Sequence, residues 1–464
     1  MLRIYNTLSE KKEVLEKPKD RPLRMFVCGP TVYDNPHIGN ARTFMAFDII
    51  VRYLRSRGLK IFYLQNITDI DDKILNRAKE EDIGWKDVAK QYEKAFSQNL
   101  KALGIKSVNK YARATDFIPE IIKQVKTLIK KGNAYLIPGD GYYFDLKTFP
   151  DYGRLAKRTV AQAEDGVSRI DASDKKRNRG DFCIWKLSAL GEHFWKTELG
   201  DGRPGWHIED TAITEKFFGP QYDIHGGALD LKFPHHEAEI AQQESASGKK
   251  PFVKIWMHAG FLTVSGQKMS KSLGNFVTIG ESLAKYPAEV FRMAVFMHHY
   301  RLPLDYTDEA MLAAQKNLAE IKTFILKLAA VARKTGKKEI AETIAKELDE
   351  AQNKFLAALN DDFNGPQALA AIFEFMKVVN AKIWRIPGRE AKSAGQWLKN
   401  TMQSLGFDVK LVKIPAKIQV LVKKRAECRR YKQFTQSDTL RQKIFDLGYV
   451  VEDNPLGQFV YPRT

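Results

Sequence analysis

The sequence predicts an α/β fold built on a parallel sheet, followed by an all-α helix bundle and a small C-terminal α+β module. Three observations lead to this prediction. Two short apolar runs enclose an amphipathic segment near the N-terminus, a long segment has helical periodicity, and a proline-containing joint precedes a basic C-terminal stretch. The fold class follows from these periods and from the order of the segments.

The sheet is predicted from residues 24–28 and 59–66, whose short apolar runs are typical of buried strands. Between them, residues 41–56 have the period of an amphipathic helix. A strand, a glycine-bearing turn, a helix and a second strand form the βαβ unit of a Rossmann-type parallel sheet. Further strand-like runs between about residues 206 and 276 supply the other half of that sheet.

The remaining segments set the expected domain boundaries. Residues 113–205 are more irregular, which predicts an insertion between two halves of the sheet domain at 1–112 and 206–307. Apolar residues recur at three- and four-residue spacing across 308–405, and this spacing predicts a helix bundle. The small module occupies 406–464, with a basic helix followed by short strand-like pieces.

Composition restricts the class of protein further. The 464 residues are 44% hydrophobic and the N-terminus is charged rather than signal-like. Because no apolar run reaches about 18 residues, we expect a cytoplasmic protein with no membrane association. The net charge of +19 favours a polyanionic partner such as nucleic acid, although a lysine-rich solvated surface has the same composition.

The cysteines do not imply a disulfide framework, because there are only three and they are far apart: Cys28, Cys183 and Cys428. Each is therefore a buried small hydrophobe, a metal ligand or a nucleophile.

A candidate nucleotide site begins at His37-Ile38-Gly39-Asn40, which follows a turn and opens the helix of the first βαβ unit. A helix N-terminus presents free N–H groups and a positive dipole end to an anionic ligand. His37 and Asn40 are three residues apart, so we expect both on one helix face. Gly39 leaves room for an adenine ring or a ribose. A purely structural turn is the alternative interpretation.

The second half of this site is predicted at Lys268-Met269-Ser270-Lys271-Ser272, in a loop that follows a strand. Lys268 and Lys271, with Ser270 between them, are suited to clamp a triphosphate as pyrophosphate leaves. A solvated run of charge is the alternative. The two elements, in this order and each beside a strand, favour an ATP site.

These residues resemble the HIGH and KMSKS signatures of the class I aminoacyl-tRNA synthetases. Five longer sequence motifs narrow the resemblance to the cysteinyl-tRNA synthetases: FVCGPTVYDNPHIGNAR, NITDIDDKI, GRPGWHIED, IHGGALDLKFPHHEAEIAQ and WMHAGFLTVSGQKMSKSLGNF. The resemblance continues through DDFNGPQALAAIF to QSDTLRQKIFDLGYVVEDNPLG and so covers nearly the whole chain. It implies a catalytic Rossmann-type domain and an anticodon-binding C-terminal module.

The resemblance also implies one zinc ion, held by motif position at Cys28, Asp210, His235 and Glu239. The residues themselves agree with a metal site, because His235 and Glu239 are four apart and would project together from a helix. Five of the nine histidines lie in one short stretch: His207, His225, His235, His236 and His258.

Asp210 departs from the family pattern, since this chain reads HIED where the family has HIEC. Aspartate is a competent zinc ligand, but it is a harder donor than a thiolate, so we expect some loss of zinc affinity. Glu209 is the alternative ligand, and loss of the metal is the other alternative.

The implied zinc explains the choice of substrate. The cysteine thiol can bind zinc as a thiolate, whereas the hydroxyl of serine is a poor ligand. By resemblance, the amino-acid pocket is lined by Cys28, Thr68, Trp206 and His236, with His207 and His225 around the metal. For Trp206 the alternative is a core aromatic.

The basic C-terminal helix interleaves lysines and arginines with Tyr431 and Phe434, a pattern suited to phosphates and unpaired bases. Motif positions suggest four residues that face anticodon bases: Arg429, Phe434, Asp438 and Asp453. An ordinary surface position is the alternative for each. Cys428 is a packed or idle thiol.

The resemblance implies a ligase that activates L-cysteine with ATP and Mg²⁺ and transfers it to the 3′ end of tRNA(Cys). The implied catalytic residues are His37, Asn40, Lys268 and Lys271, with Gly39 and Ser270 also binding ATP. Asn40 replaces the last histidine of HIGH and cannot carry its charge. The family is expected to be monomeric. Two rivals remain: a cysteine ligase that acylates an amino sugar, and a non-catalytic tRNA-binding paralogue.

Overall fold

The computed structural model describes residues 1–158, 175–189, 193, 195–270, 273–333, 342–409 and 413–463. These residues form two compact units. Unit 1 comprises Met1–Lys285 and Tyr300–Tyr306, and unit 2 comprises Tyr286–His299 and Thr307–Thr464.

A parallel sheet forms the centre of unit 1, with strand order β11-β10-β3-β4-β5. Every neighbouring pair is parallel, so the predicted parallel sheet is confirmed. Helix α1 connects β3 to β4 as the predicted βαβ unit, and both strands are apolar runs buried on their two faces. The elements of this domain are β3 (Leu23–Val27), α1 (Ile38–Ser56), β4 (Ile61–Ile67), α2 (Asp72–Glu81), α3 (Trp85–Ala102), β5 (Lys110–Arg113), β10 (Tyr222–Ala228) and β11 (Val253–Ala259).

The insertion between the two halves is more regular than its sequence predicts. It contains α4 (Ile118–Lys130) and an antiparallel sheet of four strands: β6 (Ala134–Ile137), β7 (Gly141–Phe144), β8 (Phe182–Leu187) and β9 (Gly202–Pro204). Three of these strands, β6, β7 and β9, have only three or four residues, too few to set up a clear period of two. Helix α4 packs on α6 (Ile208–Phe218) and α7 (His235–Ser247), and these helices share one apolar core with the parallel sheet.

Smaller elements complete unit 1. The hairpin of β1 (Arg3–Asn6) and β2 (Lys11–Val14) packs beside β11, and η1 (Ala114–Phe117), η2 (Leu146–Thr148) and η3 (Leu229–Lys232) are short 3₁₀ turns. A second small sheet has the order β13-β12-β14. It is made of β12 (Leu262–Val264), β13 (Gln267–Lys268) and β14 (Leu304–Tyr306), and α8 (Ile279–Lys285) follows the loop after β13.

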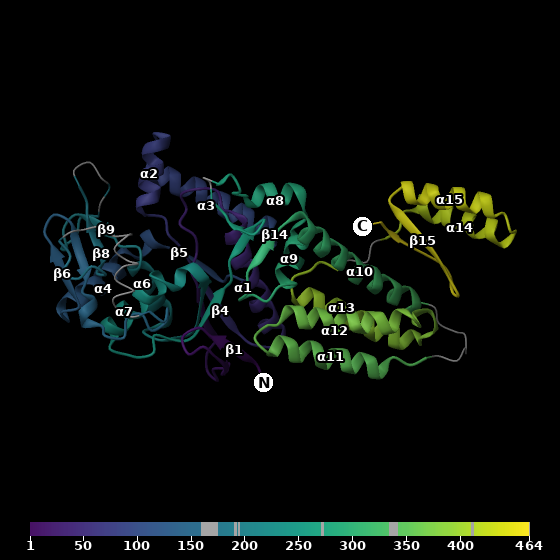
Figure 1. Cartoon of the computed structure of the whole chain (residues 1–464), viewed down its shortest axis with the longest axis horizontal. Helices are drawn as coiled ribbons and strands as arrows, with labels where there is room; N and C mark the ends of the chain where they lie inside the picture. Colours follow the sequence, from purple (N-terminus) through teal and green to yellow (C-terminus); the bar gives the residue numbers. More distant parts are fainter. Residues whose placement is uncertain are drawn as a thin grey trace. The chain divides into compact units, whose positions relative to one another are not determined.

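Unit 2 contains the predicted helix bundle. Helix α11 packs on α12, and α10 packs on α13 and on α9 (Figure 1). The helices are α9 (Ala288–Phe296), α10 (Asp308–Ala332), α11 (Ala345–Asn360), α12 (Gly365–Asn380) and α13 (Gly388–Ser404), with a 3₁₀ turn η5 (Ile383–Arg385). Helix α10 begins where Thr307 Oγ1 accepts the Ala310 N–H at 3.1 Å, as an N-cap does. No described helix has the apolar length that crossing a bilayer requires.

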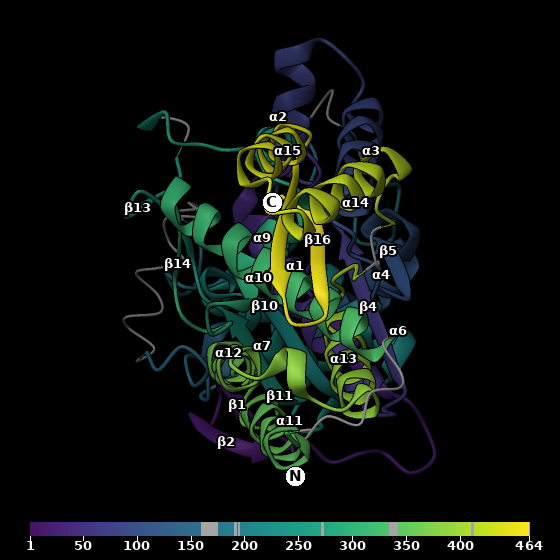
Figure 2. The same ribbon diagram turned by 90° about the vertical axis from the view of Figure 1, so that its right-hand side faces the viewer.

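The C-terminal module is α+β, as predicted, but its basic segment is two helices and not one. Helix α14 (Ala416–Arg430) ends before Lys432, whose φ of 57° is left-handed and breaks the helix. Helix α15 (Phe434–Asp446) follows, and then the antiparallel hairpin of β15 (Tyr449–Asn454) and β16 (Gly457–Pro462) (Figure 2). A small core joins these elements through Ile418, Ile444 and Val451.

Candidate active site and metal centre

His37 is the N-cap of α1 and has extended backbone angles. Its Nδ1 accepts a hydrogen bond from the Gly39 N–H at 3.1 Å, and its own N–H donates to Asn40 Oδ1 at 3.2 Å. His37 and Asn40 therefore form a reciprocal capping box. The expectation that both lie on one helix face is wrong, because His37 precedes the helix and its side chain turns back to cap it.

The first N–H groups of α1 are satisfied within the protein. The Gly39 N–H binds His37, and the Ile38 N–H donates to Val277 O at 3.1 Å. The expectation that free N–H groups face a ligand is therefore wrong for these two. Because Nδ1 of His37 is an acceptor, its neutral ring carries the proton on Nε2. Burial lowers the pKa of His37 and so favours this neutral form.

The KMSKS segment lies against the start of α1, although the two are far apart in the sequence. The Phe276 and His37 rings are 5.3 Å apart, and His37 forms an isolated antiparallel bridge with Thr278. A Cβ on Gly39 would lie 2.8 Å from His37 Nδ1 and 3.0 Å from Met269 Cε. Glycine at this position thus allows the close approach of the two signatures.

Within the KMSKS loop, Lys268 is exposed, and its Nζ is 5.8 Å from the centroid of the Phe261 ring. Asn275 holds the loop, since its Oδ1 accepts the Ser270 N–H at 2.8 Å and its Nδ2 donates to Lys268 O at 3.2 Å. Two residues of the loop lie outside the described residues: Lys271 and Ser272.

Two adjoining cavities, of 280 and 230 Å³, open at the carboxyl ends of the parallel strands. Both are lined by Cys28, His37 and Asn40. The first cavity also reaches two of the predicted amino-acid residues, Thr68 and Trp206, and two of the predicted metal ligands, Asp210 and His235. The prediction that His236 lines the amino-acid pocket is wrong, because its ring is fully buried and does not reach the cavity. The second also reaches the predicted nucleotide residues: Gly39, Lys268 and Met269. The two predicted pockets are therefore contiguous.

The predicted metal ligands come together from three segments. Cys28 follows β3, Asp210 lies on α6, and His235 and Glu239 lie one turn apart on α7. One ligand atom from each lies within 4.8 Å of the others. Asp210 Oδ2 is 3.3 Å from Cys28 Sγ and 3.0 Å from His235 Nε2, and Glu239 Oε1 is 3.3 Å from the same nitrogen.

This cluster concentrates acidic groups where water is excluded. Burial raises the pKa of the Cys28 thiol well above its usual range, and the nearby Asp210 and Glu239 carboxylates raise it further. Burial and Asp210 likewise raise the pKa of Glu239. Burial lowers the pKa of His225 and His236, which keeps these imidazoles neutral. A bound cation would favour the thiolate and the carboxylates, and neutral imidazoles are the form that binds metals.

The donor set fits a divalent cation. Asp210 Oδ1 and Glu239 Oε2 are buried and accept no hydrogen bond from the described residues. In the part of the chain that the structure describes, their ion pairs at up to 4.0 Å are made by histidines only. One thiol, one imidazole and two carboxylates all belong to the ligand types of zinc.

Glu209, the alternative ligand, points to a different partner. Thr68 Oγ1 donates a hydrogen bond to its carboxylate, and Asn66 Nδ2 lies 3.4 Å from the same oxygen. Glu209 belongs to neither group of potential metal ligands among the described residues. It supports Thr68 at the edge of the cavity.

Trp206 is half-buried and lines the cavity, so it is not a core aromatic. Its ring stacks on His235 with centroids 4.4 Å apart. His207 Nδ1 also lies 2.8 Å from His235 Nδ1. These contacts fix the orientation of the His235 ring, so that its Nε2 faces the carboxylates.

In the C-terminal module, all four predicted base-facing residues are exposed: Arg429, Phe434, Asp438 and Asp453. Asp453 also has an internal partner. Its carboxylate accepts two hydrogen bonds of 2.8 Å from the guanidinium of Arg425, which is 1% exposed. Arg429 Nε lies 3.5 Å from the same carboxylate. The aromatic rings of Tyr431 and Phe434 are exposed as well, at 65% and 56%.

Several cavity residues were not predicted. Asn66 lies two residues before Thr68 and lines the same cavity, as do Tyr33, Lys73 and Asp230. The position of Asn66 at the carboxyl end of β4 is a signal that the sequence contains, because the carboxyl ends of parallel strands meet at one edge of a sheet. The other three lie on loops or helices whose place depends on the fold.

Three family models match the chain in succession. The catalytic-domain model for class I (C) tRNA synthetases matches residues 14–317, and a DALR domain model matches residues 354–409. A model for the anticodon-binding domain of cysteinyl-tRNA ligase matches residues 412–460.

Relatives of similar length match along the whole chain. A cysteine–tRNA ligase of Thermococcus onnurineus is 41% identical over 98% of this chain and 98% of its own length. A cysteine–tRNA ligase of Methanococcus maripaludis is 39% identical over 100% of this chain and 99% of its own.

Solved structures agree on the fold. The methionyl-tRNA synthetase of Mycobacterium tuberculosis, in complex with methionyl-adenylate, has a TM-score of 0.65 at 17% identity, over 83% of this chain and 91% of that chain. By the family models and the full-length relatives, this chain belongs to the cysteine–tRNA ligase family of class I aminoacyl-tRNA synthetases.

Proposed function

We propose that this protein activates L-cysteine with ATP and transfers it to the 3′ end of tRNA(Cys). The observation that carries the proposal is the contiguity of the two cavities, which brings Cys28 and the metal cluster next to His37, Asn40 and Lys268. An amino acid bound beside Cys28 and the predicted metal ligands would therefore lie next to a nucleotide bound at His37, Asn40 and Lys268. That proximity is the main requirement of adenylation, because the reaction depends on positioning and electrostatics.

The metal of the site is zinc, held by Cys28, Asp210, His235 and Glu239. The ion would supply a Lewis-acidic centre that favours a thiolate over a hydroxyl, which would select cysteine over serine. Thr68, braced by Glu209, and Trp206, stacked on His235, line the pocket around the rest of the amino acid. His236 is fully buried, and its Nε2, 3.1 Å from the Cys28 sulfur, helps to orient that side chain.

In the first step the carboxylate of cysteine attacks the α-phosphorus of ATP, which enters as its Mg²⁺ complex, and pyrophosphate leaves. His37 donates its Nε2–H to the phosphate oxygens on which negative charge develops. Asn40 uses Oδ1 for the capping box and keeps its amide nitrogen as a donor. Lys268 and Lys271 bind the departing pyrophosphate, with Ser270 beside them, and Gly39 keeps the floor of the site open. The terminal ribose hydroxyl of tRNA(Cys) then attacks the carbonyl carbon of the adenylate, and AMP leaves.

The chain divides this work among segments. The catalytic halves are 1–112 and 206–307, separated by the insertion at 113–205, and the bundle at 308–405 leads to the anticodon-binding module at 406–464. Arg429, Phe434, Asp438 and Asp453 face the anticodon from this module. The protein acts as a monomer in the cytoplasm; light scattering of the purified chain measures its oligomeric state.

Cysteine-dependent exchange of pyrophosphate into ATP, followed by charging of a tRNA(Cys) transcript, tests the proposal. We expect both activities. Without exchange the protein is a tRNA-binding paralogue and not an enzyme. Exchange without charging supports instead a ligase that acylates an amino sugar.

A further inference from the structure

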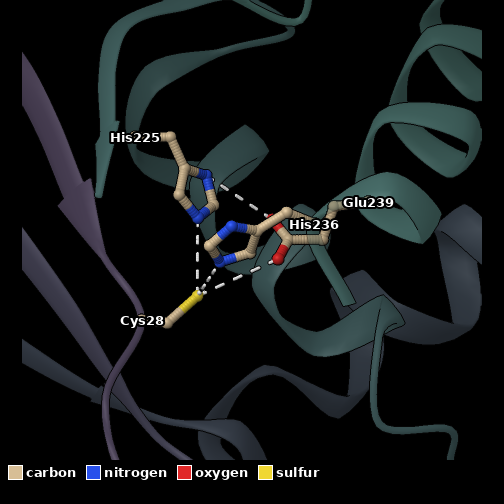
Figure 3. A group of neighbouring side chains, drawn as sticks. All are labelled: Cys28, His225, His236 and Glu239. Carbon is tan, nitrogen blue, oxygen red and sulfur yellow. Dashed lines mark hydrogen bonds and ion pairs between the residues drawn. The ribbon is translucent and has the colours of Figure 1, made fainter. Parts of the chain in front are cut away.

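The buried cluster contains two sets of four potential ligands that share two members (Figure 3). We name the first the pocket set: Cys28, Asp210, His235 and Glu239. We name the second the deep set: Cys28, His225, His236 and Glu239. In each set one ligand atom per residue lies within 4.8 Å of the others.

The geometry of the deep set is that of side chains converging on one point. His236 Nε2 lies 3.1 Å from Cys28 Sγ, and His225 Nε2 lies 3.4 Å from it. Glu239 Oε1 is 3.9 Å from the sulfur. In Figure 3 both imidazole rings and the carboxylate approach Cys28 from the same side.

The two imidazoles are also held in the orientation that metal ligands require. The Nδ1 of His225 lies 2.6 Å from the Tyr222 hydroxyl oxygen. The Nδ1 of His236 lies 2.8 Å from Nε2 of His258, whose own Nδ1 is 2.9 Å from Thr7 Oγ1. A second partner on the far nitrogen is typical of ligating histidines, because it fixes the ring and leaves the near nitrogen for the metal.

The two sets differ in their access to substrate. Cys28, Asp210 and His235 line the 280 Å³ cavity, whereas His225, His236 and Glu239 do not. His225 and His236 are fully buried. An ion in the pocket set therefore faces the amino acid, and an ion in the deep set is withdrawn from it.

The sets also differ in donor chemistry. The pocket set offers one sulfur, one nitrogen and two carboxylates, while the deep set offers one sulfur, two nitrogens and one carboxylate. Borderline divalent ions such as Zn²⁺ and Co²⁺ favour imidazole and thiolate over carboxylate. Because of the aspartate at position 210, the pocket set is the harder of the two ligand sets.

We propose that the deep set is a second coordination position for the same single ion, which keeps the ion in the protein when the pocket set is broken. The proposal rests on the metal binding in the proposed function. The ion moves between the positions without leaving Cys28 or Glu239, because both sets share these ligands. An ion of borderline softness occupies either position, one at a time.

The test uses full-length protein loaded with Co²⁺ or Zn²⁺, and the variants Asp210→Ala, His225→Gln and the double variant. Cys28→Ala, which removes a ligand that both sets share, is the reference for loss of the ion. Metal content is measured by mass spectrometry, and X-ray absorption counts the sulfur and imidazole neighbours of the ion. His298→Gln is the matched control, since His298 lies in unit 2. Circular dichroism and thermal unfolding are measured for each variant, to check that it is folded.

We expect Asp210→Ala to keep close to one ion per chain, with two imidazoles and one sulfur around it. His225→Gln also keeps the ion, with one imidazole, and the folded double variant loses it. The inference is overturned if folded Asp210→Ala loses the ion as completely as Cys28→Ala does. An unmodified protein that binds no ion refutes the metal part of the proposed function, and this separates the two failures.

Discussion

His37 has two tasks at the start of α1. Its Nδ1 caps the helix by accepting the Gly39 N–H. In the proposed mechanism, the Nε2–H that this contact leaves available donates to the phosphate of ATP. A side chain that caps α1 but has no donor at the position of Nε2 would keep the helix and lose the proposed hydrogen bond to phosphate.

We therefore predict that His37→Asn keeps the fold but lowers the rate of cysteine-dependent pyrophosphate exchange. Loss of one preorganised donor to developing charge typically costs on the order of 10²-fold or more in rate. The turnover number should fall while the KM for cysteine changes little, because His37 acts on phosphate. His298→Gln serves as the control. A His37→Asn protein with unchanged turnover would exclude this role.

The metal ligands support a second prediction at the same scale. We expect that chelation of the ion removes most of the preference for cysteine over serine, since only the thiol is a good ligand for zinc. Pyrophosphate exchange with each amino acid, before and after chelation and after zinc is restored, measures the preference. Equal selectivity in the metal-free protein would refute the role of the metal in substrate choice.

Sequence motifs were sufficient to nominate Cys28, Asp210, His235 and Glu239, because helix spacing and the family words point to them. They did not separate Asp210 from Glu209. That distinction depends on the direction in which each side chain leaves α6: Asp210 turns toward Cys28, and Glu209 turns toward Thr68.

At the scale of elements, the contact between α1 and the KMSKS loop depends on Gly39. A Cβ there would press on the His37 ring and on Met269. We predict that Gly39→Ala raises the KM for ATP and slows exchange about tenfold or more, because misplacement by an ångström near the reacting groups can cost on the order of 10²-fold. Gly395→Ala, at a helical position of α13 where a Cβ would lie 3.5 Å from Leu328 Cβ, is the control for the effect of an added methyl group away from the site. Normal ATP kinetics in Gly39→Ala would show that the close approach is unnecessary.

The pair of Arg425 and Asp453 joins α14 to β15. The side chain of Arg425 is 1% exposed and that of Asp453 is 38% exposed. Water therefore screens the charge of Asp453 but not that of Arg425. We predict that Asp453→Asn destabilises the C-terminal module by about 1–2 kcal/mol, less than the 3–5 kcal/mol of a fully buried pair. Thermal unfolding measures this loss, and Asp438→Asn, on the exposed face of α15, is the matched control. Equal stability with weaker tRNA binding would assign Asp453 to the bases alone.

Elements with a strong period were predicted well, and elements without one were not. The βαβ unit and the helix bundle follow from apolar spacing. The strands of the insertion were missed because β9 has only three residues and β6 only four. The break between α14 and α15 was missed because it rests on the left-handed backbone of Lys432, and no glycine or proline marks it.

At the scale of the molecule, the order of the strands explains why residues so distant in the sequence form one site. Strand β10, from the second half, lies beside β3, from the first half, so Cys28 at the end of β3 meets the histidines that follow β9. The sequence predicted two halves of one sheet, but only the strand order determines which ligands meet. The deep set illustrates this limit, because its histidines come from β10 and α7 and share no local motif.

The positive charge is a property of the whole chain. Its net charge of +19 attracts the phosphates of a nucleic acid.

The defining activity of this protein is the attachment of cysteine to tRNA(Cys). Charging assays with purified protein, ATP and cysteine test it most directly, with a tRNA(Cys) transcript and the same transcript carrying an altered anticodon. We predict efficient cysteine attachment to the first and strongly reduced attachment to the second. No cysteine attached to tRNA(Cys), in a protein that is folded and loaded with metal, would contradict the account.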